Sequence, residues 1–468
     1  MRITKLSIKN YKNLQDFLWE LNADYPVAVI VGKNGSGKTN LLEAIITIFQ
    51  DLQLYSERSK SNSLPNFEFE LTYQHGEDSD EIVIKNNGKL EITRNGENVP
   101  LDQLETLRQD VSQGADILPK SIFVYYAGNT TRLHDLTDKS ISRYKDYLTE
   151  VANKKIELPT LPKPPLFYYD LIHHRIVFLT LLLSTNENIS RKFLDDELSV
   201  TELESVELII ERPHWNKSKD TASFWDAPAY LKFILGIIRE TASLEISTEP
   251  NEIKFEIPGK DLRKKFAATS SEKDFFQQLS NLVLAGYLTD VKIHFRKKEV
   301  EQTLEFADLS EGEWQRVGIR GAMEIFSGED TLFLLDEPDT FAHPRWQWEF
   351  VPDLKEAIGD NQNMQAIFIT HSPLVLSSVE KNAFFMEAGK IHILHENFGQ
   401  DANMSLAKMD VEALPEKVVD DFQYYYGLIK EGKGETEKAL AERARLEEVY
   451  GLNHEKFDNA DIMISFYK

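Results

Sequence analysis

The chain has 468 residues, a formal net charge of -24, 41% hydrophobic residues and no cysteine. This length allows two or three lobes with sizeable cores. The lack of cysteine excludes disulfides and zinc-thiolate sites and fits a reducing cytoplasm, while the acidic charge opposes a basic surface over the whole molecule. The apolar run at residues 175–183 is too short to span a bilayer. We therefore expect a cytoplasmic protein without a membrane segment, which would contact nucleic acid only through a localised site.

A glycine-rich loop follows the apolar stretch at residues 27–31, which we predict to be a buried strand. The loop, GKNGSGKT at residues 32–39, fits the pattern G-x-x-x-x-G-K-[ST]. Its glycines let backbone N–H groups converge on phosphate, its lysine reaches the outer phosphates, and its threonine hydroxyl coordinates magnesium. Apolar residues at helical spacing follow, so a helix N-terminus should face the phosphate. The predicted nucleotide-binding residues here are Asn34, Gly35, Gly37, Lys38, Thr39 and Asn40.

A second apolar stretch, at residues 331–335, ends in the acidic pair Asp336 and Glu337. A buried strand that stops at a solvated turn would also read this way. With a phosphate loop upstream, we interpret Asp336 and Thr39 as magnesium ligands and Glu337 as the group that polarises the attacking water. His371 follows a further buried strand at residues 364–370, at the edge where open α/β sheets bind ligands, and we predict that it contacts the γ-phosphate.

The remaining segments predict the architecture around these motifs. Residues 67–99 have the alternation and the two Asn-Gly turns of a β-meander. Residues 134–290 read as mostly helical, with helices at 167–183, 229–239 and 272–287 and a proline-rich connector at 158–165. We take His173 and His174 as packing or surface residues, and Asn129 as either a turn residue or a neighbour of the metal. Two charged helices, 415–430 and 435–450, should form an interaction hairpin.

Four ordered motifs, GKNGSGKT, LSEGE at residues 309–313, LFLLDEP at 332–338 and THSP at 370–373, carry a family resemblance. Together they resemble the ATP-binding-cassette class of AAA-type ATPase heads, in the branch that includes RecF, SMC and OLD-type proteins. The resemblance implies an α/β fold: a mixed sheet with the P-loop, an antiparallel β-meander, a large helical insertion and a C-terminal helical hairpin. The predicted domains are 1–133 and 291–395 for the two head lobes, 134–290 for the insertion and 396–468 for the C-terminal segment.

The resemblance also implies how the site works. ATP and Mg²⁺ would bind one head, while Ser310, Gly312 and Glu313 of a second copy close over the γ-phosphate, so that a dimer completes each site. Asp339 would signal across this interface. Lys12, in NYKNL at residues 10–14, stands where the branch has a basic residue near the phosphates. The chain departs from the branch in its acidic signature residues and at Phe341, where histidine is usual.

More diffuse motifs, including VYYAGNTTRL at residues 124–133, resemble the PtuA ATPases of the Septu and some retron systems, which defend bacteria against phage. AriA, a component of the related PARIS defence system, resembles them in its ATPase head. This resemblance implies a sensor and scaffold that regulates a separately encoded nuclease, of HNH or Toprim type, with DNA or a phage protein as trigger. The alternatives are a RecF-like DNA-repair clamp, a transporter subunit and a nucleotide-binding module without hydrolysis. The long separation of Lys38 from Ser310 in the sequence argues against a transporter subunit. The presence of Glu337 argues against a module that binds nucleotide without hydrolysing it.

Overall fold

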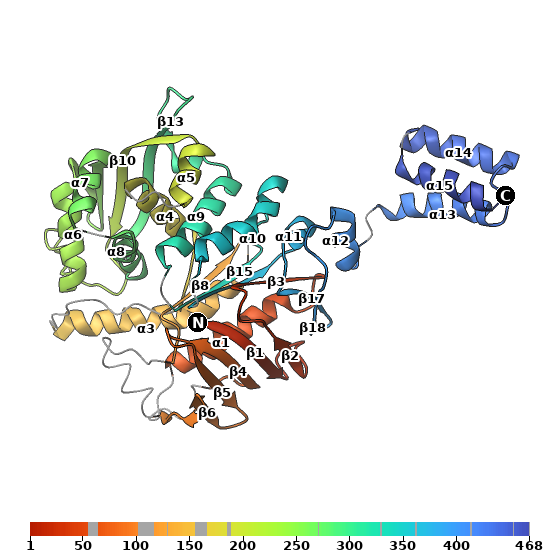
Figure 1. Ribbon diagram of the computed structural model, residues 1–468. Coiled ribbons are helices and arrows are strands. Elements are labelled where there is room, and N and C mark those ends of the chain that lie inside the picture. The colour runs from red at the N-terminus through yellow and green to blue at the C-terminus, as the bar shows by residue number, and fades with distance from the viewer. Residues whose placement is uncertain are drawn as a thin grey trace. The chain divides into compact units, whose positions relative to one another are not determined.

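The computed structural model describes residues 1–468 except 55–63, 102–116, 129, 155–165, 185–188, 270, 328–329, 361–362, 412–413, 453 and 468. The chain forms two compact units, Met1–Asp401 and Ala402–Lys468 (Figure 1). Asn129 and the proline-rich connector lie outside the described residues. No helix within the described ranges has both the length and the apolarity needed to cross a membrane.

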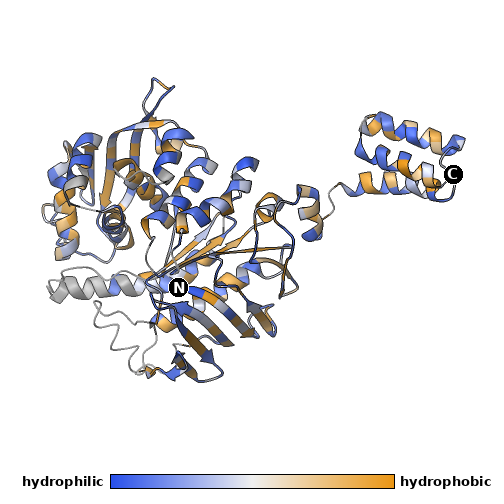
Figure 2. Ribbon diagram, in the orientation of Figure 1, coloured by the Kyte–Doolittle hydropathy of each residue, from blue (hydrophilic) through white to orange (hydrophobic). Residues whose placement is uncertain are grey.

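A seven-stranded mixed sheet forms the centre of the first unit, in the order β18-β17-β3-β16-β15-β8-β9. Neighbouring strands are parallel except β17 and β18. Parallel strands buried on both faces need continuous apolar sequence, and β3, β15 and β16 are buried at every residue. Figure 2 shows the strands at the centre of the first unit mostly in the colour of hydrophobic residues. The predicted strands at 27–31, 331–335 and 364–370 are therefore confirmed. The bounds are β3 Val27–Gly32, β8 Ser121–Tyr126, β9 Leu166–Tyr168, β15 Thr331–Asp336, β16 Met364–Ile369, β17 Ala383–Glu387 and β18 Lys390–Ile393.

A six-stranded antiparallel sheet, in the order β2-β1-β4-β5-β6-β7, confirms the predicted β-meander. Its strands alternate buried and exposed residues because only one face is covered. The turn after β6 places Asn95 and Gly96 at positive φ, as an Asn-Gly hairpin turn requires. The bounds are β1 Arg2–Lys9, β2 Phe17–Glu20, β4 Glu68–His75, β5 Asp80–Asn86, β6 Leu90–Arg94 and β7 Glu97–Asn98.

Helix α1 (Lys38–Leu54) begins inside the glycine-rich loop and packs in one continuous core with strands of both sheets. Ile45 and Phe49 are completely buried in this core, which also includes Leu71 of β4 and Ile367 of β16. Burying a side chain of this size contributes about 1.5–3 kcal/mol. The helix is thus fixed at the end of β3, with its N-terminus at the carboxyl edge of the central sheet.

The described part of the segment between β8 and α9 contains six α-helices, as the prediction of a mostly helical insertion for residues 134–290 expects, and also a sheet that was not predicted. This sheet is antiparallel and five-stranded, in the order β11-β12-β10-β13-β14. The predicted helix at 167–183 also starts late, because Phe167 lies in β9. The strands are β10 Val200–Glu211, β11 Leu244–Glu249, β12 Glu252–Pro258, β13 Leu288–Lys297 and β14 Leu304–Glu305; the helices are α3 Arg132–Lys154, α4 Leu171–Leu183, α5 Ile189–Asp196, α6 Ala229–Thr241, α7 Gly259–Thr269 and α8 Glu272–Leu284.

Helix α9 (Glu311–Ile325) leads from this segment to β15 of the central sheet, while α10 (Pro344–Ile358) follows β15 and α11 (Pro373–Ser377) follows β16. A short 3-10 helix, Phe306–Asp308, precedes α9. Helix α4 packs closely on α9: a Cβ on Gly318 would come within 1.8 Å of the His174 ring. His173 and His174 are both buried, so their interpretation as packing residues is confirmed. Burial lowers the pKa of His174 to about 3, which keeps this ring neutral.

The second unit contains α12 (Ala402–Lys408), α13 (Glu416–Lys430), α14 (Glu437–Tyr450) and α15 (Glu455–Phe466). The two predicted helices correspond to α13 and α14 and are confirmed, while α15 was not predicted. Helices α13 to α15 enclose a core of their own, with Phe422 and Tyr425 of α13, Leu446 of α14 and Phe457 of α15. The predicted hairpin is therefore part of a bundle of three helices, α13 to α15, within this unit.

Candidate nucleotide-binding site

A cleft of about 320 Å³ opens at the carboxyl edge of the central sheet. It forms there because β3, β16 and β15 are parallel neighbours, so the segments that follow them emerge side by side. The lining residues come from the loop after β3, the start of α1, the start of α3 and the ends of β15 and β16. They are Asn34, Gly35, Gly37, Lys38, Thr39, Asn40, Arg132, Asp336, Glu337 and His371.

Close backbone approaches explain why the loop after β3 needs glycine. A Cβ on Gly32 would lie 2.2 Å from the carbonyl oxygen of Met386 on the neighbouring strand β17. Gly37 has a φ of 110°, and a Cβ there would lie 2.7 Å from the amide of Asn13. Asn13 in turn donates from Nδ2 to the Ser36 carbonyl at 2.9 Å. The loop is thereby held open by fixed contacts, with its backbone shaped to receive an anion.

Lys38 is buried within this loop and donates from Nζ to the carbonyls of Gly32 at 2.8 Å and Lys33 at 3.0 Å. Burial lowers the pKa of Lys38, while the carboxylates of Asp336 and Glu337 act in the opposite direction. The ammonium is thus positioned in the cleft beside two acidic groups, as a lysine that serves phosphate and metal together must be.

Thr39 and Asp336 form a direct contact, in which the Thr39 hydroxyl donates to Asp336 Oδ2 at 2.8 Å. Two oxygen donors at this separation fit magnesium, which prefers oxygen ligands and binds proteins through few carboxylates. Burial raises the pKa of Asp336 to about 6, and the Glu337 charge adds to the rise. A divalent cation would reverse that effect by favouring the ionised carboxylate.

Glu337 follows Asp336 with a φ of 56°, a strained value for a residue with a side chain. The turn is fixed because its N–H donates to the Ile369 carbonyl at 2.8 Å. Its Oε1 lies 3.4 Å from Nε2 of His371, which joins the ends of β15 and β16. Burial lowers the pKa of His371, and the positive charge of Lys38 lowers it further. A carboxylate and an imidazole therefore face the cleft together, the pair needed to orient a water and a γ-phosphate.

The signature residues do not line the cleft of their own chain. Ser310 caps α9: its hydroxyl accepts from the Glu313 N–H at 3.3 Å, and Glu313 Oε2 accepts from the Ser310 N–H at 2.7 Å. Gly312 lies against the loop after Glu337, since a Cβ there would be 2.6 Å from the Phe341 carbonyl oxygen. Asp339, in this loop, accepts from the Thr370 hydroxyl at 2.7 Å. The signature residues therefore lie outside the cleft lining, as does Phe341, which is exposed.

Lys12 is also absent from the lining. Its ammonium pairs with the buried carboxylate of Glu43 on α1 and lies near the ring of Tyr11. Arg132 pairs with the same carboxylate and does line the cleft. Sequence reasoning missed this arginine, although it follows the strand at 121–126 by only six residues; at that strand end the pattern singled out Asn129 alone. The roles of Lys12 and of the other predicted site residues stay predictions.

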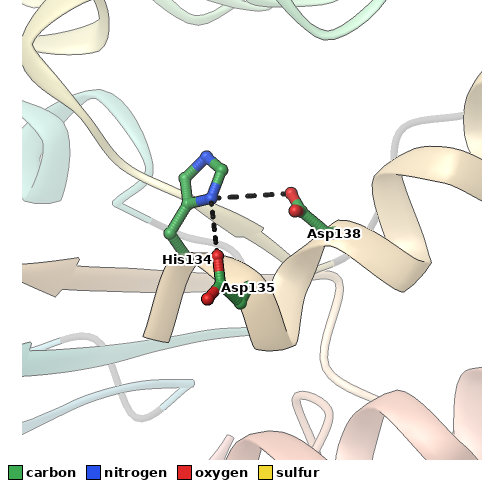
Figure 3. A group of neighbouring side chains, drawn as sticks. All are labelled: His134, Asp135 and Asp138. Atoms are coloured by element: carbon green, nitrogen blue, oxygen red, sulfur yellow. Dashed lines mark ion pairs between the residues drawn. The ribbon is translucent and has the colours of Figure 1, made fainter. Parts of the chain in front are cut away.

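The helix that begins at Arg132 also carries His134, Asp135 and Asp138, whose ligand-type atoms lie within 4.8 Å of one another (Figure 3). His134 Nδ1 is 3.8 Å from Asp135 and 3.6 Å from Asp138. The three side chains are exposed, and Asp135 also accepts from the Thr131 hydroxyl at 2.9 Å. Acidic groups in the first turns of a helix stabilise its N-terminus, which accounts for the group without an ion.

Two family models match the chain. Residues 1–170 match "AAA ATPase domain", and residues 146–377 match "AAA domain, putative AbiEii toxin, Type IV TA system". Both describe AAA domains, and together they span the cleft and all its lining residues. The chain therefore contains AAA-type ATPase domains, which confirms the predicted ATPase.

Among individual relatives, the chain is similar over 94% of its length to the "Retron Vc95 probable ATPase" of Vibrio cholerae, with 22% identity over 85% of that protein. It is also similar to the "DNA replication and repair protein RecF" of Staphylococcus carnosus, with 30% identity over 113 residues, which cover 23% of this chain and 28% of RecF.

Two solved structures were compared with the fold. The alignment with the SMC head domain from Thermotoga maritima spans 85% of this chain and 99% of that domain, with 17% identity and a TM-score of 0.34. The alignment with the recombination mediator protein RecF in complex with ATP spans 84% of this chain and 97% of RecF, with 18% identity and a TM-score of 0.37.

Proposed function

We propose that this ATPase binds MgATP in the cleft at the edge of the central sheet and hydrolyses it slowly as a head-to-head dimer. In this way it would regulate a separately encoded nuclease in antiphage defence. The convergence of a phosphate loop, the Thr39 and Asp336 oxygen pair and the Glu337 and His371 pair in one cleft carries the proposal. Magnesium would supply charge neutralisation at the phosphates, held by Thr39 and Asp336. Glu337 would orient the attacking water, and His371 would contact the γ-phosphate.

The position of the signature supports a composite site. Ser310 is exposed, Gly312 packs under the loop that carries Asp339 and Phe341, and both lie outside the cleft of the same chain. A second copy could present these residues to the nucleotide, with the N-terminus of α9 directed at the phosphates. ATP would then bridge two heads, so a monomer would hydrolyse poorly and activity should rise with protein concentration.

The defence role rests on the retron relative, which aligns over nearly the whole chain, and on the resemblance to PtuA-type ATPases. On this proposal the head comprises residues 1–133 and 291–395, and the insertion 134–290 and the segment 396–468 hold the nuclease and the trigger. The nuclease would be of HNH or Toprim type, and the trigger DNA or a phage protein. All of these would meet in the cytoplasm.

The test is to express the chain with its genomic neighbours and to purify it with ATP and magnesium as wild type, Glu337→Gln and Lys38→Ala. We expect Glu337→Gln to reduce hydrolysis about 10²- to 10⁴-fold, as loss of a general base does, and to retain an ATP-bridged oligomer with its nuclease. Lys38→Ala should lose both nucleotide and oligomer. Mass measurement and identification of the co-purified protein check this. A lone monomer for all three proteins would contradict the proposal.

A RecF-like DNA clamp is the second candidate, favoured by the 30% identity to RecF over about a quarter of the chain. It predicts hydrolysis stimulated by duplex DNA and no associated nuclease. A Glu337→Gln dimer that binds DNA and co-purifies with no other protein would move this candidate to first place.

A further inference from the structure

Arg132 is a basic residue that lines the cleft but belongs to none of the four ordered sequence motifs. It is the first residue of α3, shortly after β8. Strand β8 pairs in parallel with β15, and Tyr126 stands opposite Asp336 in the register. The segments after the two strands therefore emerge at the same edge of the sheet, which brings Arg132 into the cleft with Lys38 and Asp336.

Two residues of α1 hold the guanidinium in place. Arg132 Nη2 donates to Asn40 Oδ1, and its Nε pairs with Glu43 Oε1. Asn40 and Glu43 are three residues apart, so they share one face of the helix that starts in the phosphate loop. The Glu43 side chain is 1% exposed, whereas that of Arg132 is 46% exposed. The arginine is thus anchored on one side and open toward the cleft on the other.

The geometry suits a phosphate better than it suits a purely structural pair. A guanidinium has five N–H donors in a fixed fork, and the contacts to Asn40 and Glu43 leave donors for a further anion. Lys38 and Arg132 are the Lys and Arg side chains among the described lining residues, against the carboxylates of Asp336 and Glu337. A triphosphate carries several negative charges, so a second cation beside Lys38 would neutralise charge that Lys38 alone does not.

Lys12 provides an internal comparison. It pairs with the other oxygen of Glu43, Oε2, but does not line the cleft. Glu43 thus holds one cation on each side, and only Arg132 is directed to the nucleotide. We propose that Arg132 contacts the phosphate chain of the nucleotide bound by the same chain, beside Lys38, and that Glu43 and Asn40 position it. This inference rests on the proposed nucleotide site and adds a ligand-binding residue to it.

The experiment measures the affinity of the full-length chain for ATP and ADP, in magnesium, by calorimetric titration. Wild type, Arg132→Ala, Arg132→Lys and Lys38→Ala are compared with Arg296→Ala, which removes an exposed arginine paired with Glu204 in the insertion. We expect Arg132→Ala to weaken ATP binding about 10- to 100-fold, the loss expected for a charge-assisted contact. Arg132→Lys should regain part of it, because a lysine keeps the charge without the fork. Arg296→Ala should bind as wild type does.

A double variant separates a phosphate contact from a structural role. If Arg132 serves only to neutralise Glu43, then Glu43→Gln combined with Arg132→Ala should restore wild-type affinity, and that outcome would overturn the inference. If Arg132 binds phosphate, the double variant should be as weak as Arg132→Ala alone. Unchanged affinity of Arg132→Ala in a chain that loses ATP with Lys38→Ala would also overturn the inference, while leaving the nucleotide site intact. A wild-type chain that binds no ATP would overturn both.

Discussion

At the scale of single residues, the polar contacts of Gln347 connect two loops that carry the proposed catalytic groups. Its Nε2 donates to the carbonyls of Ala342 at 3.2 Å and Asp339 at 3.4 Å, and its Oε1 accepts from the Ser372 hydroxyl at 2.8 Å. The first two belong to the loop after Glu337, and Ser372 follows His371 directly. We therefore expect Gln347 to act as a positioning residue: it is not among the lining residues, yet it links the segments that follow Glu337 and His371.

Replacing Gln347 by leucine keeps the size of the side chain and removes all three contacts. We expect turnover to fall about tenfold, because small displacements of positioned catalytic groups are costly, while the ATP dissociation constant changes less than about threefold. Gln347→Glu keeps the acceptor for Ser372 but loses both donors, so it should be nearly as slow. Steady-state kinetics and a binding titration check this, with Lys355→Ala on the same helix as the control. Equal losses in affinity and turnover would contradict a positioning role.

The sequence made most of the cleft predictable, because the phosphate loop, the acidic pair and the strand-end histidine each follow an apolar strand with a recognisable pattern. Arg132 and Gln347 have no such pattern. Arg132 enters the cleft only because β8 pairs with β15, and Gln347 reaches its partners only because α10 folds back over two loops. Lys12 shows the converse, since a matching motif did not place its side chain in the cleft.

At the scale of elements, α9 and α10 are joined by a buried ionic network. Asp353 of α10 accepts from Arg316 Nε at 2.7 Å and pairs with Arg320 at 2.9 Å. The two arginine side chains are 7% and 6% exposed and that of Asp353 is 13% exposed. Burial raises the pKa of Asp353 and the two arginines oppose the rise. Asp353 is therefore the carboxylate that both buried arginines share, and it links the signature helix to the helix after the acidic pair.

Asp353→Ala should leave both guanidiniums without their shared partner and lower the free energy of unfolding of the first unit by about 3 kcal/mol. The matched control is Glu356→Ala, which removes a 58% exposed partner of Arg320 and should cost less than about 1 kcal/mol. All six tryptophans lie between residues 19 and 348, so tryptophan fluorescence during urea unfolding reports on this unit. Equal effects of the two substitutions would show that burial of the network contributes nothing.

The five-stranded sheet of the insertion shows what the sequence patterns could not give. In β10 the buried residues Val200, Leu203 and Val206 are three apart, because register shifts interrupt the pairing with β13. Spacing of this kind imitates a helix, and the strand is rich in Glu and Leu, which favour helices. Pairing with β12 and β13 overrides that preference. By contrast, β12 alternates buried residues with less buried ones and could have been recognised.

At the scale of the whole molecule, the chain consists of two units with separate cores, and the second has only residues 402–468. A unit of this size buries a smaller fraction of its surface than a large domain does, so we expect a small free energy of unfolding. Its exposed apolar side chains include Leu440, Leu452 and Phe466. The first unit contains the complete cleft, so nucleotide binding should not depend on whether the second unit is folded.

Phe422→Ala tests this independence. Phe422 is fully buried, and its ring centre lies 5.2 Å from that of Phe457 and 5.0 Å from that of His454. Its loss should cost about 3–5 kcal/mol, enough to unfold the second unit at 37 °C. The unit has no tryptophan, so helical circular dichroism should fall while tryptophan fluorescence and ATP affinity keep their wild-type values. Tyr424→Ala, on the same helix but 50% exposed, should change none of these. A common shift of both signals would mean that the units unfold together, and that the nucleotide site depends on the second core.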